Sequence, residues 1–141
     1  MRVMFMGEYQ HKLDSKKRLA IPVKFRAPLS EGFVVCKAPD HCLYIYSKEE
    51  WEPVAAQIQS LPGTEEFRRF KREFFRNAEL ADLDSQGRFT VKSTMLDYAD
   101  ITSDVVIIGS GNKLEVWNAD SDTKESKRTL SADELGVEVV F

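Results

Sequence analysis

Residues 13–18 read Leu-Asp-Ser-Lys-Lys-Arg, and residues 83–88 read Leu-Asp-Ser-Gln-Gly-Arg, so one motif occurs twice at an offset of 70 positions. Each copy places an Arg four residues after an Asp. Further matches at an offset of 70 or 71 pair 19–21 with 89–91, 34–35 with 105–106 and 43–46 with 114–117. An internal repeat constrains the whole architecture. Two copies predict a unit with pseudo-twofold symmetry.

The size of each copy indicates how the two are combined. The chain has 141 residues, 43% of them hydrophobic, which is typical of one globular domain. Each copy spans only about 40–45 residues, close to the size below which a hydrophobic core rarely holds by itself. We therefore expect the two copies to interleave around one shared core.

Hydrophobic periodicity and turn residues predict the same order of elements in both copies. In the first copy the expected elements are strands over 4–13 and 18–23, a turn over 14–17, a helical turn over 25–29 and a hairpin of 33–36 with 43–46. In the second they are strands over 79–84 and 88–92, a short helix after Ser93 and a hairpin of 105–109 with 114–117. Gly87 stands where the first copy has Lys17, so this turn position is expected to need a positive φ, which strains Lys mildly.

Helical sequence connects the copies. Ser47 to Glu50 has the spacing of a capping box, although Pro53 is expected to delay or kink the helix. Thr64 is expected to cap a helix over 65–77 with an apolar stripe of Phe67, Phe70 and Phe74. Basic side chains lie on its opposite face: Arg68, Arg69, Lys71, Arg72 and Arg76.

The C-terminal part is polar. Residues 118–129 show no helical periodicity, a second capping box over 131–134 is cut short by Gly136, and 137–141 have strand character. The expected organisation is a first repeat over 8–51, a connecting helical segment over 52–77, a second repeat over 78–121 and a polar tail over 122–141.

Charge is distributed unevenly along the chain. The formal net charge is −3, but residues 1–76 hold 14 Lys and Arg against 10 Asp and Glu, whereas residues 77–141 hold 6 against 13. A basic patch can attract a phosphate backbone even on an acidic protein. The acidic total argues against an indiscriminate DNA-coating protein, so any nucleic-acid binding is expected to be local and multiplied by repetition.

The remaining composition indicates a cytoplasmic protein. The two cysteines, Cys36 and Cys42, fit a reducing compartment better than a disulfide framework. Glu8 interrupts the N-terminal apolar residues too early for a signal peptide, and no run of 18 apolar residues predicts a membrane span.

The paired turns are the first candidate site. An Arg at the exit of such a turn can enter the DNA major groove and contact guanine O6 and N7 together, and Lys16 and Lys17 beside it would bind phosphates. The alternative is that Asp14–Arg18 and Asp84–Arg88 are local ion pairs that only stabilise the turns. Both roles are compatible, because an Asp can orient the Arg that reads a base.

Other candidates are weaker. The basic helix face would widen a DNA footprint, pair with acidic residues of a neighbouring subunit or simply be solvated, and an exposed Phe75 would suit a subunit contact. Cys36, His41 and Cys42 do not have a zinc spacing, and no cofactor or small-molecule substrate is indicated.

Two other functional classes compete with DNA binding. An enzyme would need Asp14 and Asp84 as an acid–base pair, yet each has an Arg that would keep it ionised, and the common catalytic motifs are absent from the sequence. A partner-binding or toxin-neutralising module, in which the turns are only structural, remains the main alternative to DNA binding.

Several stretches together resemble the MraZ family, bacterial transcriptional regulators with two SpoVT/AbrB-like domains in one chain. The stretches are 6–9, 13–26, 42–43 and 83–88 within a resemblance over about 4–118. The resemblance implies an α+β, β-rich fold in which two interleaved repeats form a pseudo-twofold double-split β-barrel with flanking helices. Lys17 departs from the family's usual Gly, and the family's second long helix is not expected in 118–129.

The resemblance also implies a function. Family members form ring-like homo-oligomers and bind tandem direct repeats of double-stranded DNA upstream of the division and cell-wall gene cluster, including their own gene, usually as repressors. A nucleoid-associated location in the cytoplasm would follow. The roles carried over are DNA contact for Arg18, Arg88, Lys16, Lys17 and Gln86, and shaping of the turns for Asp14, Asp84 and Gly87.

Overall fold

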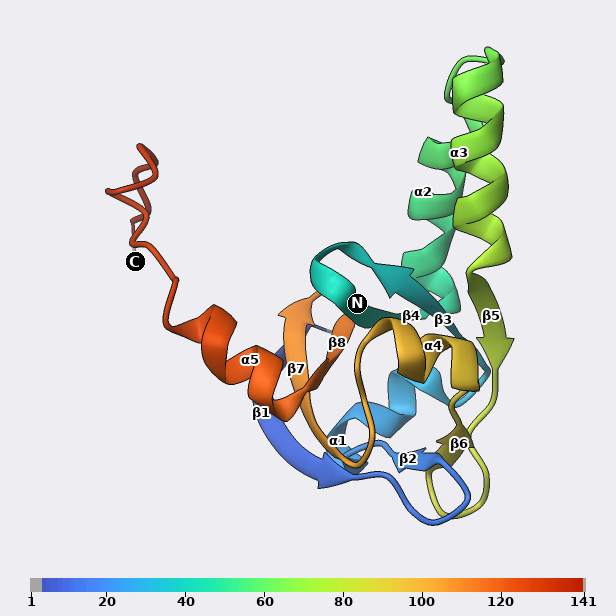
Figure 1. The fold of residues 1–141 in the computed structure, drawn as a ribbon, viewed down its shortest axis with the longest axis vertical. Coiled ribbons are helices and arrows are strands. Elements are labelled where there is room, and N and C mark those ends of the chain that lie inside the picture. The colour runs from blue at the N-terminus through green and yellow to red at the C-terminus, as the bar shows by residue number, and fades with distance from the viewer. Residues whose placement is uncertain (1–3, 141) are drawn as a thin grey trace.

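The computed structural model describes residues 4–140 and has the expected α+β class, rich in β-structure (Figure 1). The strands of the first half are β1 (Phe5–Lys12), β2 (Arg18–Ala20), β3 (Phe33–Ala38) and β4 (Cys42–Ser47). Those of the second half are β5 (Ala78–Ala81), β6 (Arg88–Thr90), β7 (Asp104–Gly111) and β8 (Leu114–Asn118). The helices are α1 (Val23–Arg26), α2 (Lys48–Gln59), α3 (Glu65–Arg76), α4 (Ser93–Tyr98) and α5 (Ala119–Ser126), with 3-10 turns η1 (Ala27–Leu29) and η2 (Pro39–His41).

Strand pairing confirms that the halves are interleaved. The six-stranded sheet has the order β1-β7-β8-β4-β3-β5, and the two-stranded sheet pairs β2 with β6. The first strand of each half therefore pairs with the third strand of the other half, antiparallel in both cases. If each strand is replaced by its equivalent in the other half, the same strand order results, read from the opposite edge of the sheet. This is the expected pseudo-twofold symmetry.

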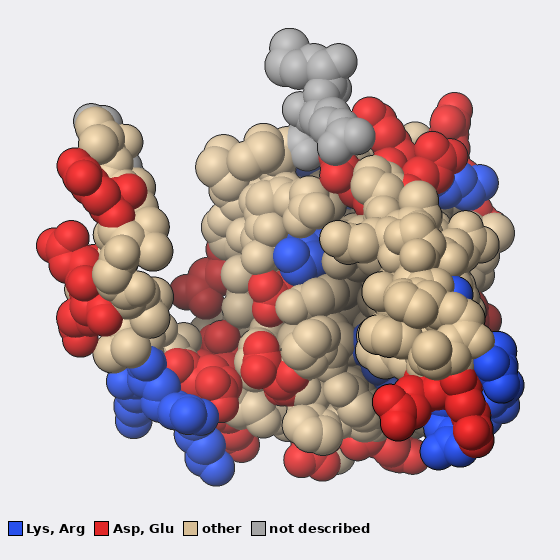
Figure 2. All heavy atoms as spheres, turned by 90° about the horizontal axis from the view of Figure 1, so that it is seen from above, with Lys and Arg blue, Asp and Glu red and all other residues tan. Residues whose placement is uncertain are grey.

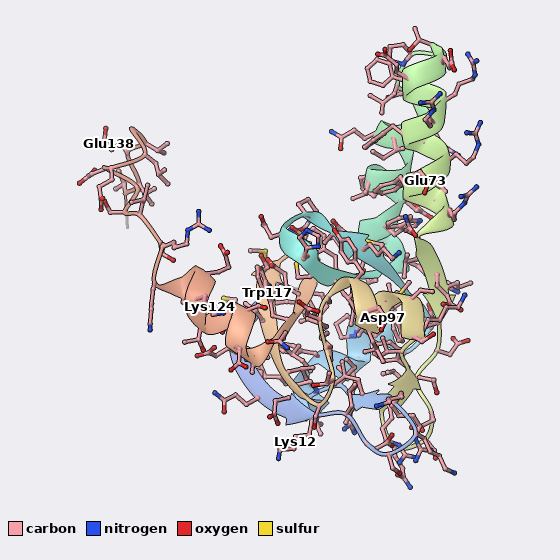
Figure 3. All side chains as sticks on the ribbon, in the orientation of Figure 1. Lys12, Glu73, Asp97, Trp117, Lys124 and Glu138 are labelled. Carbon is pink, nitrogen blue, oxygen red and sulfur yellow. The ribbon has the colours of Figure 1, made fainter. Side chains whose placement is uncertain are left out.

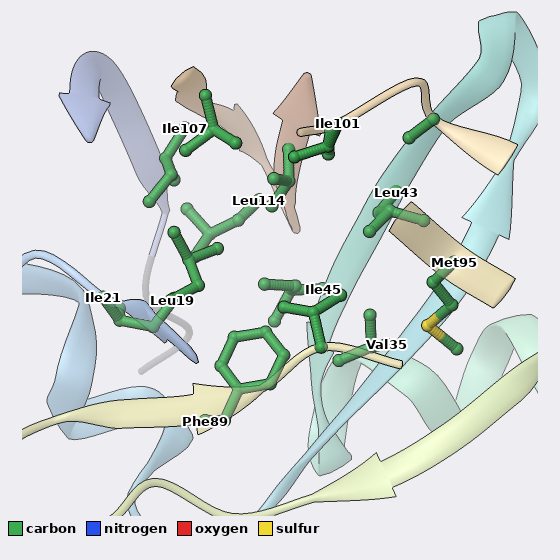
Figure 4. Close-up of a cluster of buried hydrophobic side chains, with 14 of the residues drawn as sticks. Leu19, Ile21, Val35, Leu43, Ile45, Phe89, Met95, Ile101, Ile107 and Leu114 are labelled. Atoms are coloured by element: carbon green, nitrogen blue, oxygen red, sulfur yellow. The ribbon is translucent and has the colours of Figure 1, made fainter. Parts of the chain in front are cut away.

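One apolar core lies between the two sheets and draws on both halves (Figure 4). Phe33 from the first half meets Phe89 from the second edge to face, with 5.1 Å between ring centroids. Leu19 and Ile21 are fully buried beside residues of β7 and β8 such as Ile107 and Leu114. Neither half contains this core alone, as the size of a single copy predicted.

The short strands end earlier than the sequence predicted. β2 and β6 each stop after three residues because a helix begins soon afterwards, at Val23 in α1 and at Ser93 in α4. Pro22 is the residue before α1, and its fixed φ of −51° suits a helix start. The predicted strand over 79–84 is β5, which spans only Ala78–Ala81 and leaves Leu83 and Asp84 to the turn.

Helices α2 and α3 form a hairpin that projects from the sheets (Figure 1). Ser47 caps α2 as predicted, since its hydroxyl accepts a hydrogen bond from the Glu50 N–H at 3.2 Å. Pro53 lies inside α2 without delaying its start. Thr64 precedes α3, but its side chain makes no capping bond, so that part of the prediction is wrong.

The apolar stripe of α3 is only partly covered. Trp51 of α2 stacks on Phe74 at 5.6 Å between ring centroids and meets Phe75 edge to face. Phe67 and Phe70 are 39% and 51% exposed, respectively. Phe75 is half-buried, so the most exposed aromatic side chains of the hairpin lie nearer the N-terminal end of α3 than the sequence suggested.

The C-terminal end differs most from the sequence-based prediction. Residues 118–129 were expected to be non-helical, yet α5 forms because the Asn118 carboxamide oxygen accepts bonds from the Asp120 and Ser121 N–H groups. The predicted capping box over 131–134 is present as two reciprocal bonds, but it closes only a turn. Residues 137–140 form no strand, and Phe141 lies outside the described residues. No helix within 4–140 combines the length and apolarity that crossing a membrane requires.

Candidate nucleic-acid interface

The first turn is built around the Asp14 carboxylate. One oxygen accepts the backbone N–H groups of Lys16 and Arg18, each at 2.9 Å. The other accepts the Arg18 Nε–H at 2.7 Å. The Asp14 backbone N–H also donates to the Arg18 carbonyl, and the Lys17 N–H donates to the Asp14 carbonyl. Asp14 thereby fixes both the loop and the Arg at its exit.

The second turn repeats these bonds. Asp84 accepts the N–H groups of Gln86 and Arg88 at 2.9 Å and the Arg88 Nε–H at 3.1 Å. Its backbone exchanges the corresponding bonds with Arg88 and Gly87. Lys17 has a φ of 61° and Gly87 a φ of 74°, which confirms the positive φ predicted at this position in both copies.

The two turns lie side by side and are joined directly. β2 and β6 pair antiparallel, with Arg18 opposite Thr90 and Ala20 opposite Arg88. The Val91 N–H donates to the Lys17 carbonyl at 3.0 Å, and the Ile21 N–H donates to the Gly87 carbonyl at 2.9 Å. Each turn is therefore held by the strand of the other copy, and both are presented at one end of the molecule, away from α2 and α3 (Figure 1).

The side chains of Arg18 and Arg88 still have N–H groups available to bind a ligand. The two side chains are 28% and 26% exposed, respectively. Within residues 4–140, Asp14 or Asp84 occupies Nε, and the terminal Nη groups make no hydrogen bond, although one Arg88 Nη lies 3.9 Å from Asp14. A guanidinium held in this way presents a planar pair of N–H donors, the geometry that fits a guanine edge or a phosphate.

The remaining predicted site residues surround the arginines. Lys16, Lys17 and Gln86 are exposed at the tips of the turns, whereas Gly87 is buried. The turns thus gather all eight predicted site residues at the paired β2–β6 ends. The role of each residue toward DNA stays a prediction.

Arg26 is a structural residue that sequence reasoning left without a role. Its Nε–H donates to the Ile21 carbonyl at 2.8 Å, and its guanidinium covers Gly87 so closely that a Cβ there would clash with it. The corresponding residue of the second copy is Leu96. Because only one copy has this Arg, the repeat itself gave no signal for it.

The hydrogen bonds of the turns shift the acidity of both aspartates. The backbone N–H of Arg18 lowers the pKa of Asp14 below its usual value, and the backbone N–H of Arg88 does the same for the pKa of Asp84. The Arg side chains lower both pKa values further. Both carboxylates therefore stay ionised at neutral pH, as the sequence analysis expected, and do not suit general-acid catalysis.

This shift predicts a pH dependence of stability. A carboxyl group whose pKa is lowered in the folded state stabilises the fold above its unfolded pKa of about 4, and this stabilisation is lost as the pH falls through the folded pKa. We expect Asp84→Asn to unfold more easily at pH 7 and to lose less stability than wild type between pH 5 and pH 2. Urea unfolding across this range measures it. An identical pH profile in the variant would contradict it.

The positive φ of Lys17 predicts that Lys17→Gly stabilises the protein. A left-handed conformation costs a non-glycine residue about 1–2 kcal/mol, part of which is offset by the greater freedom of Gly when unfolded. We expect a gain of about 0.5–1 kcal/mol in the free energy of unfolding by urea titration. Lys16→Gly, one position earlier without a positive φ, is the control and should be destabilising. Equal stability of the two variants would disprove the account.

Other sequence candidates are not assembled into a site. Within residues 4–140, no three His, Cys, Asp or Glu side chains are grouped to hold a metal ion. Burial raises the pKa of the Cys36 and Cys42 thiols to about 12, so neither is a reactive thiolate. Two α3 arginines are occupied by ion pairs on their own helix, Arg69 with Glu65 and Arg76 with Glu73.

The comparisons with known proteins match one and the same family along most of the chain. A family model described as "MraZ protein, putative antitoxin-like" matches residues 4–73 and 74–129. The transcriptional regulator MraZ of Halothermothrix orenii is 44% identical over 117 residues, which cover 82% of each chain. Those of Natranaerobius thermophilus and Syntrophomonas wolfei are 39% and 41% identical; the matches cover 97% of both chains in the first case, and 93% of this chain and 92% of the relative in the second.

The chain is a transcriptional regulator, which is the name carried by the relatives that it matches along most of their length. The match of the family model to both halves agrees with the two interleaved repeats of the structure. The chain belongs to the MraZ family.

Proposed function

We propose that this protein is a sequence-specific DNA-binding repressor in which Arg18 and Arg88 read guanine in the major groove. The observation that carries the proposal is the pair of equivalent turns, each holding an Arg by its Nε and leaving its Nη groups without a hydrogen bond to any residue in 4–140. A guanidinium oriented by a carboxylate keeps the donor geometry that bidentate contact with guanine needs. Asp14, Asp84 and Gly87 shape the turns.

Phosphate contacts would come from the turn tips. Lys16 and Lys17 are exposed beside Arg18, and Gln86 occupies the equivalent place beside Arg88. Such contacts position a protein on the duplex without reading its sequence. The two turns differ here, since the first offers two cations and the second a neutral amide. The first turn is therefore expected to contribute more to the salt dependence of binding.

One protomer alone would discriminate poorly between its specific DNA site and other DNA. Each reading Arg is worth about 1–3 kcal/mol of discrimination, whereas specific and non-specific sites commonly differ by roughly 4–10 kcal/mol. A ring-like homo-oligomer supplies the remainder, because linked protomers bind successive short repeats with higher avidity and without new contacts. The operator proposed is therefore a set of tandem direct repeats.

The biological setting follows from the family. We place the operator upstream of the division and cell-wall gene cluster, including this protein's own gene, and the protein on the nucleoid in the cytoplasm. The reading units are repeats over 8–51 and 78–121, joined by 52–77 and followed by the tail over 122–141. The proposed regulator acts by binding DNA and needs no cofactor.

The test is binding to DNA from immediately upstream of this protein's gene, with one, two and four direct repeats compared across a salt series. We expect affinity for one isolated repeat to be feeble, and affinity to rise at least tenfold with four, with a linear fall of log affinity against log salt. Equal binding to one and to four repeats would refute the proposal. A stable complex with a protein partner and no salt-dependent DNA binding would favour the partner-binding alternative.

A further inference from the structure

Half-buried apolar side chains and the exposed Leu80 gather at the foot of the helical hairpin. A groove of about 420 Å³ lies between α2, α3 and the edge strand β5. Trp51 and Phe75 line it from the helices, and Leu80, 63% exposed, lines it from β5. Because β5 is an outer strand of the six-stranded sheet, this groove opens at an unpaired sheet edge. Patches of this kind mark an interaction surface.

The lining of the groove carries Lys48 together with Glu52 and Glu79, whereas the adjoining helix α3 is basic. α3 carries five Lys and Arg residues against three Glu. Arg72 is exposed, and its side chain makes no ion pair or hydrogen bond with any residue in 4–140. Arg68 and Lys71 only donate to backbone carbonyls of the loop before α3. The surface, here called the hairpin groove, is therefore largely apolar with mixed charge in its lining, and it adjoins the basic side chains of α3.

The C-terminal tail has the complementary chemistry. Residues 129–141 contain three acidic residues and no basic one. Five of its apolar side chains are at least half exposed: Leu130, Leu135, Val137, Val139 and Val140. The tail stands apart from the rest of the protein with acidic side chains along it (Figure 2). Within residues 4–140, these apolar side chains therefore remain largely open to solvent.

The tail and the hairpin groove are at opposite sides of one molecule. β4 and β8 are antiparallel neighbours, so α2 and α5, which follow them, leave from opposite ends of the sheet. Glu138 on the tail and Glu73 on α3 are correspondingly far apart in Figure 3. Each protomer thus has one tail and one hairpin groove, and the two face in opposite directions. Such a pair suits a head-to-tail contact between copies, which closes into a ring when the rotation allows.

We propose that residues 130–140 of one protomer dock in the hairpin groove of a second protomer. The valines of the tail would lie against Trp51, Phe75 and Leu80, and its acidic residues would face Arg72. This inference rests on the homo-oligomer of the proposed function and names the contact that builds it. The contact covers the exposed apolar side chains at both ends. It also pairs charge, since the three acidic residues of the tail meet the basic excess of α3, away from Glu52 and Glu79 of the groove lining.

Two interface variants and a mixing experiment test the contact. The tail variant is Val137→Asp with Val139→Asp, and the groove variant is Leu80→Asp with Arg72→Glu. Val23→Asp is the matched control, because Val23 is 74% exposed on α1, outside both surfaces. Molecular mass is measured by light scattering after size exclusion, and circular dichroism verifies folding.

We expect wild type and Val23→Asp to assemble and each interface variant alone to be monomeric. An equimolar mixture of the two variants should form one-to-one dimers and nothing larger, because each pair retains one intact tail and one intact groove. If both variants keep the wild-type mass, or if the mixture stays monomeric, the docking proposal is refuted while the ring stands. Monomeric wild type would refute the ring as well, whereas DNA binding by Arg18 and Arg88 is measured separately.

Discussion

Arg18→Ala and Arg88→Ala are each expected to abolish specific DNA binding while leaving the fold intact. In one protomer, the loss of a bidentate guanine contact costs about 1–3 kcal/mol, which is about 5- to 150-fold in affinity. In an oligomer that binds several repeats, the same loss occurs in every protomer and multiplies. Fluorescence anisotropy with four direct repeats and with a scrambled duplex measures the ratio of specific to non-specific binding.

The controls separate reading from simple loss of charge. Arg69→Ala removes the same charge from α3, where Arg69 is 70% exposed and pairs only with Glu65, so specificity should be unchanged. Arg18→Lys keeps the charge but lacks the planar pair of donors, and should retain the salt dependence while losing sequence preference. If the alanine variants bind the repeats as wild type does, the turns are structural and the search moves to α3 and to protein partners.

Gly109→Ala is expected to be the most destabilising of the conservative substitutions. Gly109 lies on β7 between β1 and β8, opposite Gly7 and Leu114. A Cβ at this position would lie closer than 3.0 Å to backbone atoms of Phe5 and Met6. Backbone cannot rotate away as a side chain would, so β1 must shift and draw Phe5 out of the core. We expect a loss of about 1–3 kcal/mol and a Tm lower by roughly 5–10 °C.

Gly63→Ala is the matched control for this substitution. Gly63 lies in the loop before α3, where a Cβ would meet nothing within 4 Å and φ is not positive. Its stability should stay within about 0.5 kcal/mol of wild type. Thermal unfolding followed by circular dichroism compares the three proteins. A Gly109→Ala variant as stable as Gly63→Ala would mean that β1 is held more loosely than its pairing with β7 indicates.

The sequence predicted best the features that occur in both repeats. Two copies too small for separate cores implied interleaving, and β1–β7 and β3–β5 pair accordingly. The substitution of Gly87 for Lys17 implied a positive φ at both, which the backbone confirms. Each inference used one copy as the comparison for the other. The doubled Asp–Arg motif likewise located the candidate site, although its contact with DNA stays a prediction.

Features that occur once escaped this comparison. The Arg26 side chain over Gly87 depends on how α1 packs against the other copy, which no local pattern encodes. α5 was missed because a capping Asn118 can begin a short helix that has no apolar stripe. Val137 and Val139 give the tail strand character in the sequence, yet a strand needs a neighbour to pair with, and within residues 4–140 the tail has none.

The pairing of the first strand of each half with the other half also delays folding of the nascent chain on the ribosome. β1 emerges first, but its pairing partner β7 lies roughly 100 residues later, which at 5–20 residues per second is about 5–20 s of translation. Throughout that interval the nascent first half has a core strand without its sheet. Its aromatic residues stay open to water or to chaperones until β7 and β8 leave the exit tunnel. Slow codons or pauses between β4 and β7 would therefore lengthen the most aggregation-prone period in the life of this chain.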